Sequence, residues 1–149
     1  MRAVYQRVLS ASVSVDGETV GEIGQGILLF LGIETDDGEA QAEKLAGKVA
    51  ALRVFSDGQG KMNRSVLDVG GEILLIPNFT LCGSCRHGRR PEFLSAARPE
   101  AAEPLFRSFA ERLARAGVRK VATGVFGADM RILAENDGPV TLMLNTKEW

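Results

Sequence analysis

The side chains most able to carry chemistry are concentrated in one short stretch, Pro77 to Pro91 (PNFTLCGSCRHGRRP). It contains both cysteines of the chain, Cys82 and Cys85, and its only histidine, His87. Three arginines lie in its second half. A Cys-x-x-Cys pair suits redox chemistry, a further histidine suggests zinc, and arginines suit phosphate groups. The stretch therefore raises three different hypotheses.

The redox and zinc hypotheses are the weaker two. A redox Cys-x-x-Cys pair depends on a helix N-terminus that stabilises the thiolate, but no helix signal follows Cys85. A structural zinc site needs four ligands, and only Cys82, Cys85 and His87 are at hand. We therefore expect two incidental loop thiols, a solvated histidine, no metal and no cofactor. The neighbouring arginines would still favour a reactive thiolate, so redox function stays open.

The arginine cluster is the more suggestive feature. Arg86, Arg89, Arg90 and Arg98 lie within 13 residues, and a guanidinium fork matches a phosphate group bidentately. The net charge of the whole chain is -1, so nucleic-acid binding would depend on such a local patch. A solvated loop whose arginines pair with nearby acids fits the same residues, and the sequence leaves both interpretations open.

A second stretch, Asn136 to Thr141 (NDGPVT), combines a glycine and a proline ahead of an apolar segment. Such a pair usually makes a simple turn. Proline is also where cis peptide bonds occur, and glycine allows another molecule to approach the backbone closely. A turn that presents backbone carbonyls to a ligand is therefore the alternative interpretation.

The elements that must position these residues begin with strands. Alternating residues from Val13 to Val20 are interrupted by Asp16-Gly17, which predicts a β-hairpin. The apolar run Ile27 to Leu31 predicts a strand buried on both faces, and Glu72 to Ile76 predicts another. A short strand is expected over Arg53 to Phe55, followed by a polar, glycine-rich loop over Ser56 to Asn63.

Two amphipathic helices are predicted. The first follows the capping candidates Asp36-Asp37-Gly38, and its buried stripe is Ala42, Leu45, Val49 and Leu52. The second has its buried stripe at Leu105, Phe109 and Leu113, with Phe106 beside it. Pro99 suits a first helical turn and Gly117 a C-terminal stop, but Pro104 predicts a kink. We therefore expect this helix to begin properly near Glu103.

The end of the chain is predicted to be β-structure again. Strands are expected over Val125 to Leu133 and over Val140 to Asn145, with a turn at Asn136 to Pro139 between them. The whole predicts one α+β domain over residues 1–149, with mainly antiparallel strands in a barrel-like core and two main helices packed on them. The longest apolar run is too short to span a bilayer, and the N-terminus lacks a secretory h-region. We expect a cytoplasmic protein without membrane contacts.

Several motifs together resemble the D-aminoacyl-tRNA deacylases, first named D-tyrosyl-tRNA deacylases. They cover essentially the whole chain in the same order. The matching segments are Tyr5 to Val8 with Arg7, Phe55 to Met62, Asn78 to Leu81, Gly88 to Pro91, Phe126 to Met130 and Asn136 to Thr141. No single motif is decisive, but the set is specific.

The resemblance implies an activity and an assembly. The family hydrolyses the ester that joins a D-amino acid, or glycine mischarged on tRNA-Ala, to the terminal ribose of tRNA. It acts as a homodimer whose active site lies at the interface, with the aminoacylated 3′ end of tRNA as the other partner. A Gly-Pro bond, here Gly138-Pro139, is cis in the family and reaches into the other subunit's pocket, where backbone carbonyls reject an L side chain. An arginine matching Arg7 helps to fix that segment.

The resemblance also assigns residues to roles. The family's Ser-Gln-Phe-Thr segment corresponds to Pro77 to Thr80. The expected catalytic residues are Asn78, Phe79 and Thr80; the expected substrate-binding residues are Gly138, Pro139, Arg7, Asn136, Thr141, Phe126 and Met130; the arginines expected at the tRNA are Arg86, Arg89 and Arg90.

Ester hydrolysis needs stabilisation of an oxyanion, and the backbone N–H groups of Phe79 and Thr80 are the expected donors. The Thr80 hydroxyl is a candidate nucleophile, but no base stands near it in sequence. We prefer a water molecule activated by the tRNA 2′-hydroxyl, with the protein supplying position and chirality. Thr80 would then have a structural or polarising role.

This chain departs from the family pattern at Pro77-Asn78, where the family has Ser-Gln. A related animal group of relaxed chirality begins this segment with proline and has a trans Gly-Pro bond. Arg7 and the intact Asn136 to Thr141 segment favour the strict D-specific type. The alternatives are the relaxed deacylase, a non-catalytic nucleic-acid-binding module that uses the arginines, and a thiol redox protein.

Overall fold

The structure, a computed structural model, describes all residues from Met1 to Trp149 as a single small α+β domain. Its strands are β1 (Arg2–Val15), β2 (Glu18–Ile23), β3 (Gly26–Gly32), β4 (Phe55–Ser56), β5 (Met62–Arg64), β6 (Glu72–Pro77), β7 (Val121–Thr123) and β8 (Arg131–Asn145). Its helices are α1 (Glu39–Ala51) and α2 (Pro99–Arg115), with short 3-10 helices η1 (Phe79–Cys82) and η2 (Thr146–Glu148). No helix is long and apolar enough to cross a membrane.

The long strand β1 organises the main sheet. Along one edge it pairs with β3 through its first half and with β2 through its second half, and along the other edge it pairs with β8. These pairings are antiparallel, whereas β3–β6 and β6–β7 are parallel. The sheet curls until β2 approaches β7: a Cβ built on Gly21 would lie 3.0 Å from the Thr123 carbonyl oxygen. The predicted barrel-like α+β fold is therefore confirmed, with a mixed sheet.

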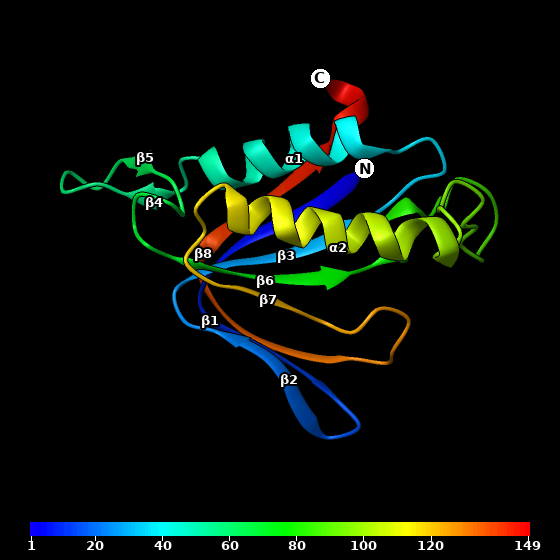
Figure 1. Cartoon of the computed structure of the whole chain (residues 1–149), viewed down its shortest axis with the longest axis horizontal. Helices are drawn as coiled ribbons and strands as arrows, with labels where there is room; N and C mark the ends of the chain where they lie inside the picture. Colours follow the sequence, from blue (N-terminus) through cyan, green and yellow to red (C-terminus); the bar gives the residue numbers. More distant parts are fainter.

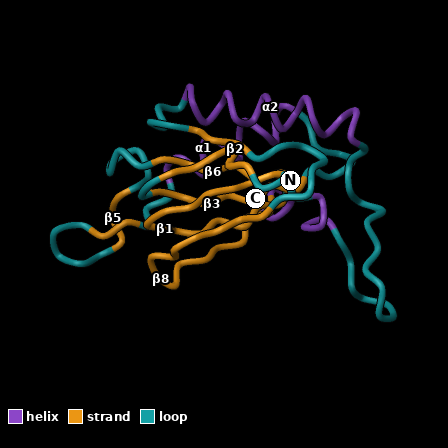
Figure 2. Tube along the Cα trace, turned by 90° about the horizontal axis from the view of Figure 1, so that it is seen from below, coloured by secondary structure: helices purple, strands orange, loops and turns teal.

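Both helices cover one face of this sheet (Figures 1 and 2), and β8 forms the edge of the sheet beside β1. The larger core forms between Leu45 and Phe109 of the helices and Tyr5, Leu29 and Leu75 of the sheet. The predicted stripes of both helices are buried, apart from Leu52, which caps α1 and is only half-buried. A smaller core fills the curl of the sheet and contains Val8, Val13, Ile23, Leu28, Leu74 and Ile76 among others.

The predicted hairpin turn at Asp16-Gly17 is confirmed. Asp16 has a φ of 51° and Gly17 a φ of 85°, so both central residues are in the left-handed region. That conformation gives a two-residue turn the twist of the strands it joins. The turn connects β1 to β2, which continue away from the helices as a projecting arm (Figure 1).

The prediction that Pro104 delays the second helix to Glu103 is wrong. Helix α2 begins at Pro99 and continues through Pro104 to Arg115. The Arg98 carbonyl accepts from the N–H groups of Ala101 and Ala102. Pro104 is exposed, so its missing N–H costs one helical hydrogen bond on the solvent side.

The predicted end of the chain also needs correction. Val125 to Leu133 is not one strand, because the chain leaves β7 at Gly124, turns at Gly127 with a φ of 76°, and resumes at Arg131. The turn expected at Asn136 to Pro139 does not reverse the chain, and β8 passes through it. Gln6 pairs with Thr141 and Val8 with Asn136, so residues 137–140 bulge out opposite Arg7 alone.

The segment between the first helix and β6 contains a small hairpin. The short strand expected over Arg53 to Phe55 is found at Phe55–Ser56, and it pairs with β5 inside the stretch predicted to be a loop. The hairpin is closed by Asp57, whose carboxylate accepts from the backbone N–H groups of Gln59 and Lys61 and from the Asn63 side chain. It projects at one end of the molecule (Figure 1).

Candidate functional site

The Asn78 to Thr80 segment lies at the end of the parallel pair β3–β6. Pro77 is the last residue of β6 in register, opposite Leu31, and the Asn78 N–H donates to the Leu31 carbonyl at 2.8 Å. The chain then turns into η1, which sits directly on β3 at Gly32. A Cβ at Gly32 would lie 2.9 Å from the Leu81 Cβ, so the absence of a side chain there allows this close packing.

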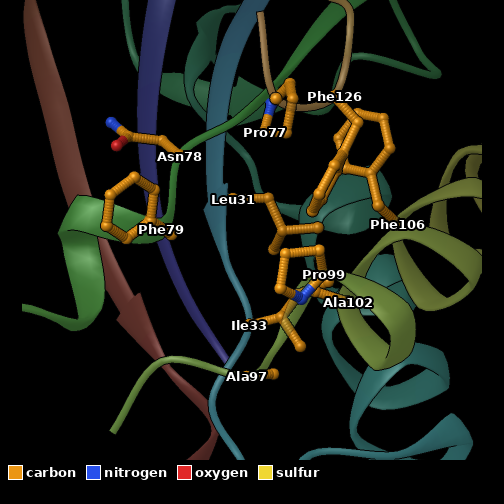
Figure 3. Close-up of a pocket in the computed structure, with 11 residues that line it drawn as sticks. Leu31, Ile33, Pro77, Asn78, Phe79, Ala97, Pro99, Ala102, Phe106 and Phe126 are labelled. Atoms are coloured by element: carbon orange, nitrogen blue, oxygen red, sulfur yellow. The ribbon is translucent and has the colours of Figure 1, made fainter. Parts of the chain in front are cut away.

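An apolar cavity of about 320 Å³ opens beside this segment. In Figure 3, Asn78 and Phe79 lie on one side of the cavity, Phe106 and Phe126 on the other, and Leu31 between them. The complete lining is Leu31, Ile33, Pro77, Asn78, Phe79, Ala97, Pro99, Ala102, Phe106, Phe126 and Gly127. The aromatic rings of Phe106 and Phe126 are tilted at 58° with their centroids 6.2 Å apart. The cavity therefore suits a flat apolar group.

A second hollow of about 360 Å³ lies on the other side of the same segment. It shares Pro77, Asn78, Phe79 and Gly127 with the first cavity and is completed by Phe30, Ile76, Ala128, Asp129, Met130 and Ile132. Phe79 is 57% exposed and stacks edge-on against Phe93, with ring centroids 5.1 Å apart. Asn78 and Phe79 thus stand between two hollows of different lining.

The Thr80 hydroxyl donates a hydrogen bond to the Asn78 side-chain oxygen. An amide oxygen cannot accept a proton as a base does, so this contact orients the hydroxyl without activating it for attack. As the first residues of a helix, Phe79 and Thr80 have backbone N–H groups without an intrahelical acceptor. These N–H groups are the donors available to a carbonyl oxygen beside Asn78.

The Asn136 to Thr141 segment is held by β1. Arg7, only 12% exposed, donates from Nε to the Asp137 carbonyl oxygen at 2.9 Å and lies 3.1 Å from the Asp137 carboxylate. Another of its guanidinium nitrogens donates to the Val54 carbonyl oxygen. The Gly138-Pro139 peptide bond is cis, and both residues are exposed on the bulge. Thr141 accepts from the Gln6 amide at 3.3 Å.

The two signature segments do not meet within one chain. Asn78 adjoins Leu31, which pairs with Ala3, whereas Gly138 and Pro139 lie opposite Arg7. Four residues along β1 and three strand spacings across the sheet separate them, roughly 20 Å at about 3.3 Å per residue and about 4.8 Å per strand. Neither hollow beside Asn78 includes Gly138 or Pro139.

The other predicted site residues are distributed as follows. Phe126 lines the apolar cavity, Met130 lines the second hollow, and Asn136 is exposed on β8 opposite Val8. Sequence reasoning missed the walls supplied by Leu31, Ala102 and Phe106: Leu31 and Phe106 appeared only as buried residues, and Ala102 was not singled out. Ala102 and Phe106 are four residues apart on α2, so their shared face was the signal that could have found them.

The thiols are in different environments. Cys82 is buried at the end of η1, where its thiol faces the Ile33 carbonyl oxygen at 3.5 Å. Burial, and secondarily the nearby Glu34 carboxylate, raises the pKa of Cys82 to about 11, so it is a protonated thiol at neutral pH. Cys85 is exposed, and both are free. No group of three or more histidine, cysteine or acidic side chains is arranged to hold a metal ion.

The arginines of the loop after η1 are not engaged in ion pairs. Arg86, Arg89, Arg90 and Arg98 are exposed, and no carboxylate lies within 4.0 Å of them. In contrast, Arg2, Arg7 and Arg112 each contact an acid. The loop is therefore solvated, as one interpretation expected, but the expectation that its arginines pair with nearby acids is wrong.

The geometry can be compared with known proteins. A sequence model of the family described as D-Tyr-tRNA(Tyr) deacylase matches residues 4–145. A D-aminoacyl-tRNA deacylase of Roseiflexus sp. (strain RS-1) is 56% identical over 146 residues, which are 98% of this chain and 94% of that protein. The D-aminoacyl-tRNA deacylase of Desulfitobacterium hafniense (strain DSM 10664 / DCB-2) is 51% identical over 148 residues, 99% of each chain.

Two solved structures are similar over nearly the full chain. The c-Myc DNA Unwinding Element Binding Protein is 41% identical, with a TM-score of 0.92 over 97% of this chain and 98% of that chain. A probable eukaryotic D-amino acid tRNA deacylase is 18% identical, with a TM-score of 0.84 over 96% and 97%. The second likeness concerns the fold alone.

Proposed function

Because the chain belongs to the D-Tyr-tRNA(Tyr) deacylase family, we propose that it hydrolyses the ester bond of D-aminoacyl-tRNA and releases a free D-amino acid and tRNA. The chain is an enzyme, a carboxylic ester hydrolase of this family. The observation that carries the proposal is its full-length identity of 51–56% to D-aminoacyl-tRNA deacylases. The hollows on either side of Asn78 and Phe79 support it, because the substrate has two unlike parts to hold.

The apolar cavity suits the terminal adenine of tRNA. Its walls offer the aromatic rings of Phe106 and Phe126 and the apolar side chains of Leu31 and Ala102. Stacking of a base on an aromatic side chain contributes about 1–3 kcal/mol. With the base held there, the ribose and its ester lie beside Asn78 and Thr80, and the amino acid extends toward the second hollow at Met130.

The chemical step needs an oxyanion site and a nucleophile. The backbone N–H groups of Phe79 and Thr80 donate to the developing oxyanion. The Thr80 hydroxyl is committed to Asn78, which is not a base, so water activated by the neighbouring tRNA 2′-hydroxyl attacks the ester carbon. As water bonds to the ester carbon, the bond between that carbon and the ribose oxygen breaks. The proton that water loses passes by way of the 2′-hydroxyl to the ribose oxygen, and the amino acid leaves with a free carboxylate after loss of the second water proton to solvent. The protein supplies position and a polarised carbonyl.

Chirality is checked by a second copy of the chain. In one subunit Gly138 and Pro139 stand roughly 20 Å from Asn78, on an exposed bulge. Exposed apolar residues on the same strand, Leu133 at 74% and Met143 at 85%, supply a surface for a homodimer. In that dimer the Gly138-Pro139 carbonyls of one subunit enter the second hollow of the other and exclude an L side chain. Glycine has no side chain, so glycyl-tRNA, including that mischarged on tRNA-Ala, is also cleaved.

The remaining residues either bind the tRNA part of the substrate or hold the Gly138-Pro139 bulge. Arg86, Arg89 and Arg90 are free of ion pairs and bind tRNA phosphates. Asn136, Thr141 and Arg7 hold the Gly138-Pro139 bulge in place. Aminoacyl-tRNA is used in translation in the cytoplasm, where the enzyme acts in proofreading. No metal or cofactor enters this hydrolysis.

The decisive experiment compares D-Tyr-tRNA, L-Tyr-tRNA and glycyl-tRNA as substrates and follows ester loss. The D ester and glycyl-tRNA should be cleaved at least about 100-fold more efficiently than the L ester, which corresponds to about 3 kcal/mol of steric exclusion. Cleavage of L-alanyl-tRNA as fast as of the D ester would assign the relaxed-chirality type instead. Absence of D-selective cleavage contradicts the proposal.

A second candidate is a nucleic-acid-binding module without turnover. It is favoured by the 41% identity to the c-Myc DNA Unwinding Element Binding Protein and by the unpaired arginines. It predicts salt-dependent binding that weakens when Arg89 and Arg90 are replaced, with no ester cleavage on any aminoacyl-tRNA.

A further inference from the structure

A third cavity, of about 490 Å³, lies at the C-terminal end of η1 and shares no lining residue with the apolar cavity. Its lining is mostly polar: Arg2, Cys82, Gly83, Ser84, Cys85, Arg86, His87, Glu92 and Ser95. The loop that forms it projects at the end of the molecule where α2 begins (Figure 1). We call this cavity the Arg2–Arg86 pocket. Of its lining residues, the proposed function uses only Arg86, as a contact with tRNA.

The loop around the pocket is held at its base. Ser84 and Glu92 exchange two backbone hydrogen bonds, of 2.8 and 3.0 Å. The Ser95 hydroxyl donates to the Cys82 carbonyl oxygen at 2.7 Å. Gly83 packs so closely on Phe93 that a Cβ there would lie 2.8 Å from the ring. These contacts fix the mouth of the pocket relative to η1, so its side chains are presented from a defined frame.

The charges of the pocket favour an anion. Arg2 is fixed by a 2.9 Å contact of one guanidinium nitrogen with the Glu34 carboxylate, and another donates to the Leu81 carbonyl at 3.3 Å. Its Nε has no partner. Arg86 lines the pocket without any carboxylate within 4.0 Å, so its full charge is available. Glu34 balances the charge of Arg2, and Glu92 is the acid in the lining itself, so Arg86 is the guanidinium whose charge no close carboxylate offsets.

The Arg2–Arg86 pocket and the apolar cavity are lined by the same two segments of the chain. Helix η1 contributes Phe79 to the apolar cavity and Cys82 to the pocket. The segment from Glu92 to Pro99 also lines both, with Ser95 on one side and Ala97 on the other. The shared wall offers an RNA strand a path from the apolar cavity to the pocket when its terminal adenosine occupies the cavity. The phosphates that follow the adenosine along that path are anions.

We propose that the Arg2–Arg86 pocket binds the backbone phosphates immediately upstream of the terminal adenosine in the single-stranded 3′ end of tRNA. This inference rests on the proposed function for the identity of the RNA. Arg86 supplies the free charge and Arg2 a guanidinium that Glu34 holds in place. Arg89 and Arg90 do not line the pocket and contact the RNA further away. The enzyme thereby recognises tRNA as a polyanion, separately from the ester.

The test measures binding of a fluorescein-labelled RNA hexanucleotide that ends in CCA and carries no amino acid. Replacement Arg86→Ala should weaken binding about 10-fold and reduce the slope of log affinity against log salt by about one. An oligonucleotide with neutral methylphosphonates at its last two linkages should bind wild type at least as weakly as the charged oligonucleotide binds the variant, because it loses the contacts with both Arg2 and Arg86. Arg115→Ala, an exposed arginine of α2, is the matched control and should change neither quantity.

Catalysis separates this inference from the proposed function. Arg86→Ala should lower kcat/KM on D-Tyr-tRNA through KM, and leave hydrolysis of a D-tyrosyl-adenosine ester, which has no upstream phosphate, unchanged. Equal RNA affinity of Arg86→Ala and wild type, or an equal loss in Arg115→Ala, overturns the pocket. Loss on the nucleoside ester as large as on tRNA also overturns it. If wild type cleaves neither ester, the deacylase proposal fails, and the binding measurements still decide the pocket.

Discussion

Arg7 fastens the backbone of Asp137 to the opposite strand: its Nε donates to the Asp137 carbonyl oxygen at 2.9 Å and lies 3.1 Å from the Asp137 carboxylate. The same guanidinium also donates to the Val54 carbonyl. One side chain thus ties β1 to the start of the β4–β5 hairpin and to the bulge that carries Gly138 and Pro139. The bulge would otherwise have only strand pairing on either side of it.

Replacing Arg7 by lysine should therefore weaken both the fold and the chirality check. Lysine keeps the charge but cannot donate from a fork to two carbonyls at once. We expect a loss of about 1.5–3 kcal/mol in the free energy of unfolding, as for hydrogen bonds to a charged group. Discrimination between D-Tyr-tRNA and L-Tyr-tRNA should also fall. Arg107→Lys, at a surface pair on α2, is the control; equal stability of the two variants would contradict the bracing role.

Thr80 is predicted to position the substrate rather than attack it. Its hydroxyl donates to Asn78, so Thr80→Ser should keep near-normal activity and Thr80→Val should lose about 10- to 100-fold in kcat. Loss of a true nucleophile costs about 10⁶-fold. Single-turnover kinetics of both variants on D-Tyr-tRNA provide the measurement. A burst of covalent aminoacyl-enzyme in wild type, absent in Thr80→Val, would show that this assignment is mistaken.

The exposed apolar strand β8 gives a prediction about assembly. Met143 is 85% exposed and pairs with Val4; its neighbour Leu144 packs against the core under the helices, so Met143 lies on the opposite face of β8. If a second copy covers this surface, Met143→Glu buries a charge at the interface and should shift the protein to monomers and abolish deacylation. Sedimentation velocity and activity are the two readouts. Leu67→Glu, at an exposed position beside Gly117 just after α2, should leave the oligomeric state unchanged; a wild-type monomer that is fully active refutes the interface site.

Much of the fold was predictable because local patterns agree with it. The glycine-bounded apolar runs gave β3 and β6, and the 3-4 spacing gave both buried helical stripes. The errors arose where tertiary pairing overrides local signals. A long β1 partner carries β8 straight through a segment that reads as a turn, and an exposed Pro104 removes only one hydrogen bond from α2.

The site was only partly predictable for a related reason. Motif residues such as Asn78 and Phe126 could be singled out in the sequence, and they share a cavity. The cavity's other walls could not, because Leu31 and Phe106 follow the same hydrophobic periodicity as core residues. Hydrophobic periodicity indicates which side chains face inward. A cavity forms where the side chains of two packed elements leave space between them, and periodicity carries no information about that space.

Cys82 provides the last prediction, which concerns thiol reactivity and pH. Burial raises its pKa to about 11 from the ordinary 9.0, so the folded protein keeps this proton between about pH 9 and 11 while the unfolded chain loses it. The folded state then binds more protons, so the thiol's contribution to stability is complete below about pH 9 and is lost as the pH rises toward 11. Urea unfolding across this pH range should show a steeper fall in the free energy of unfolding for wild type than for Cys82→Ala.

Thiol labelling tests the same difference in environment. N-ethylmaleimide at pH 7 should label the exposed Cys85 alone, and Cys85→Ser should remain unlabelled and fully active. Two labelled thiols in native protein, or a large loss of deacylation in Cys85→Ser, would instead restore the redox hypothesis.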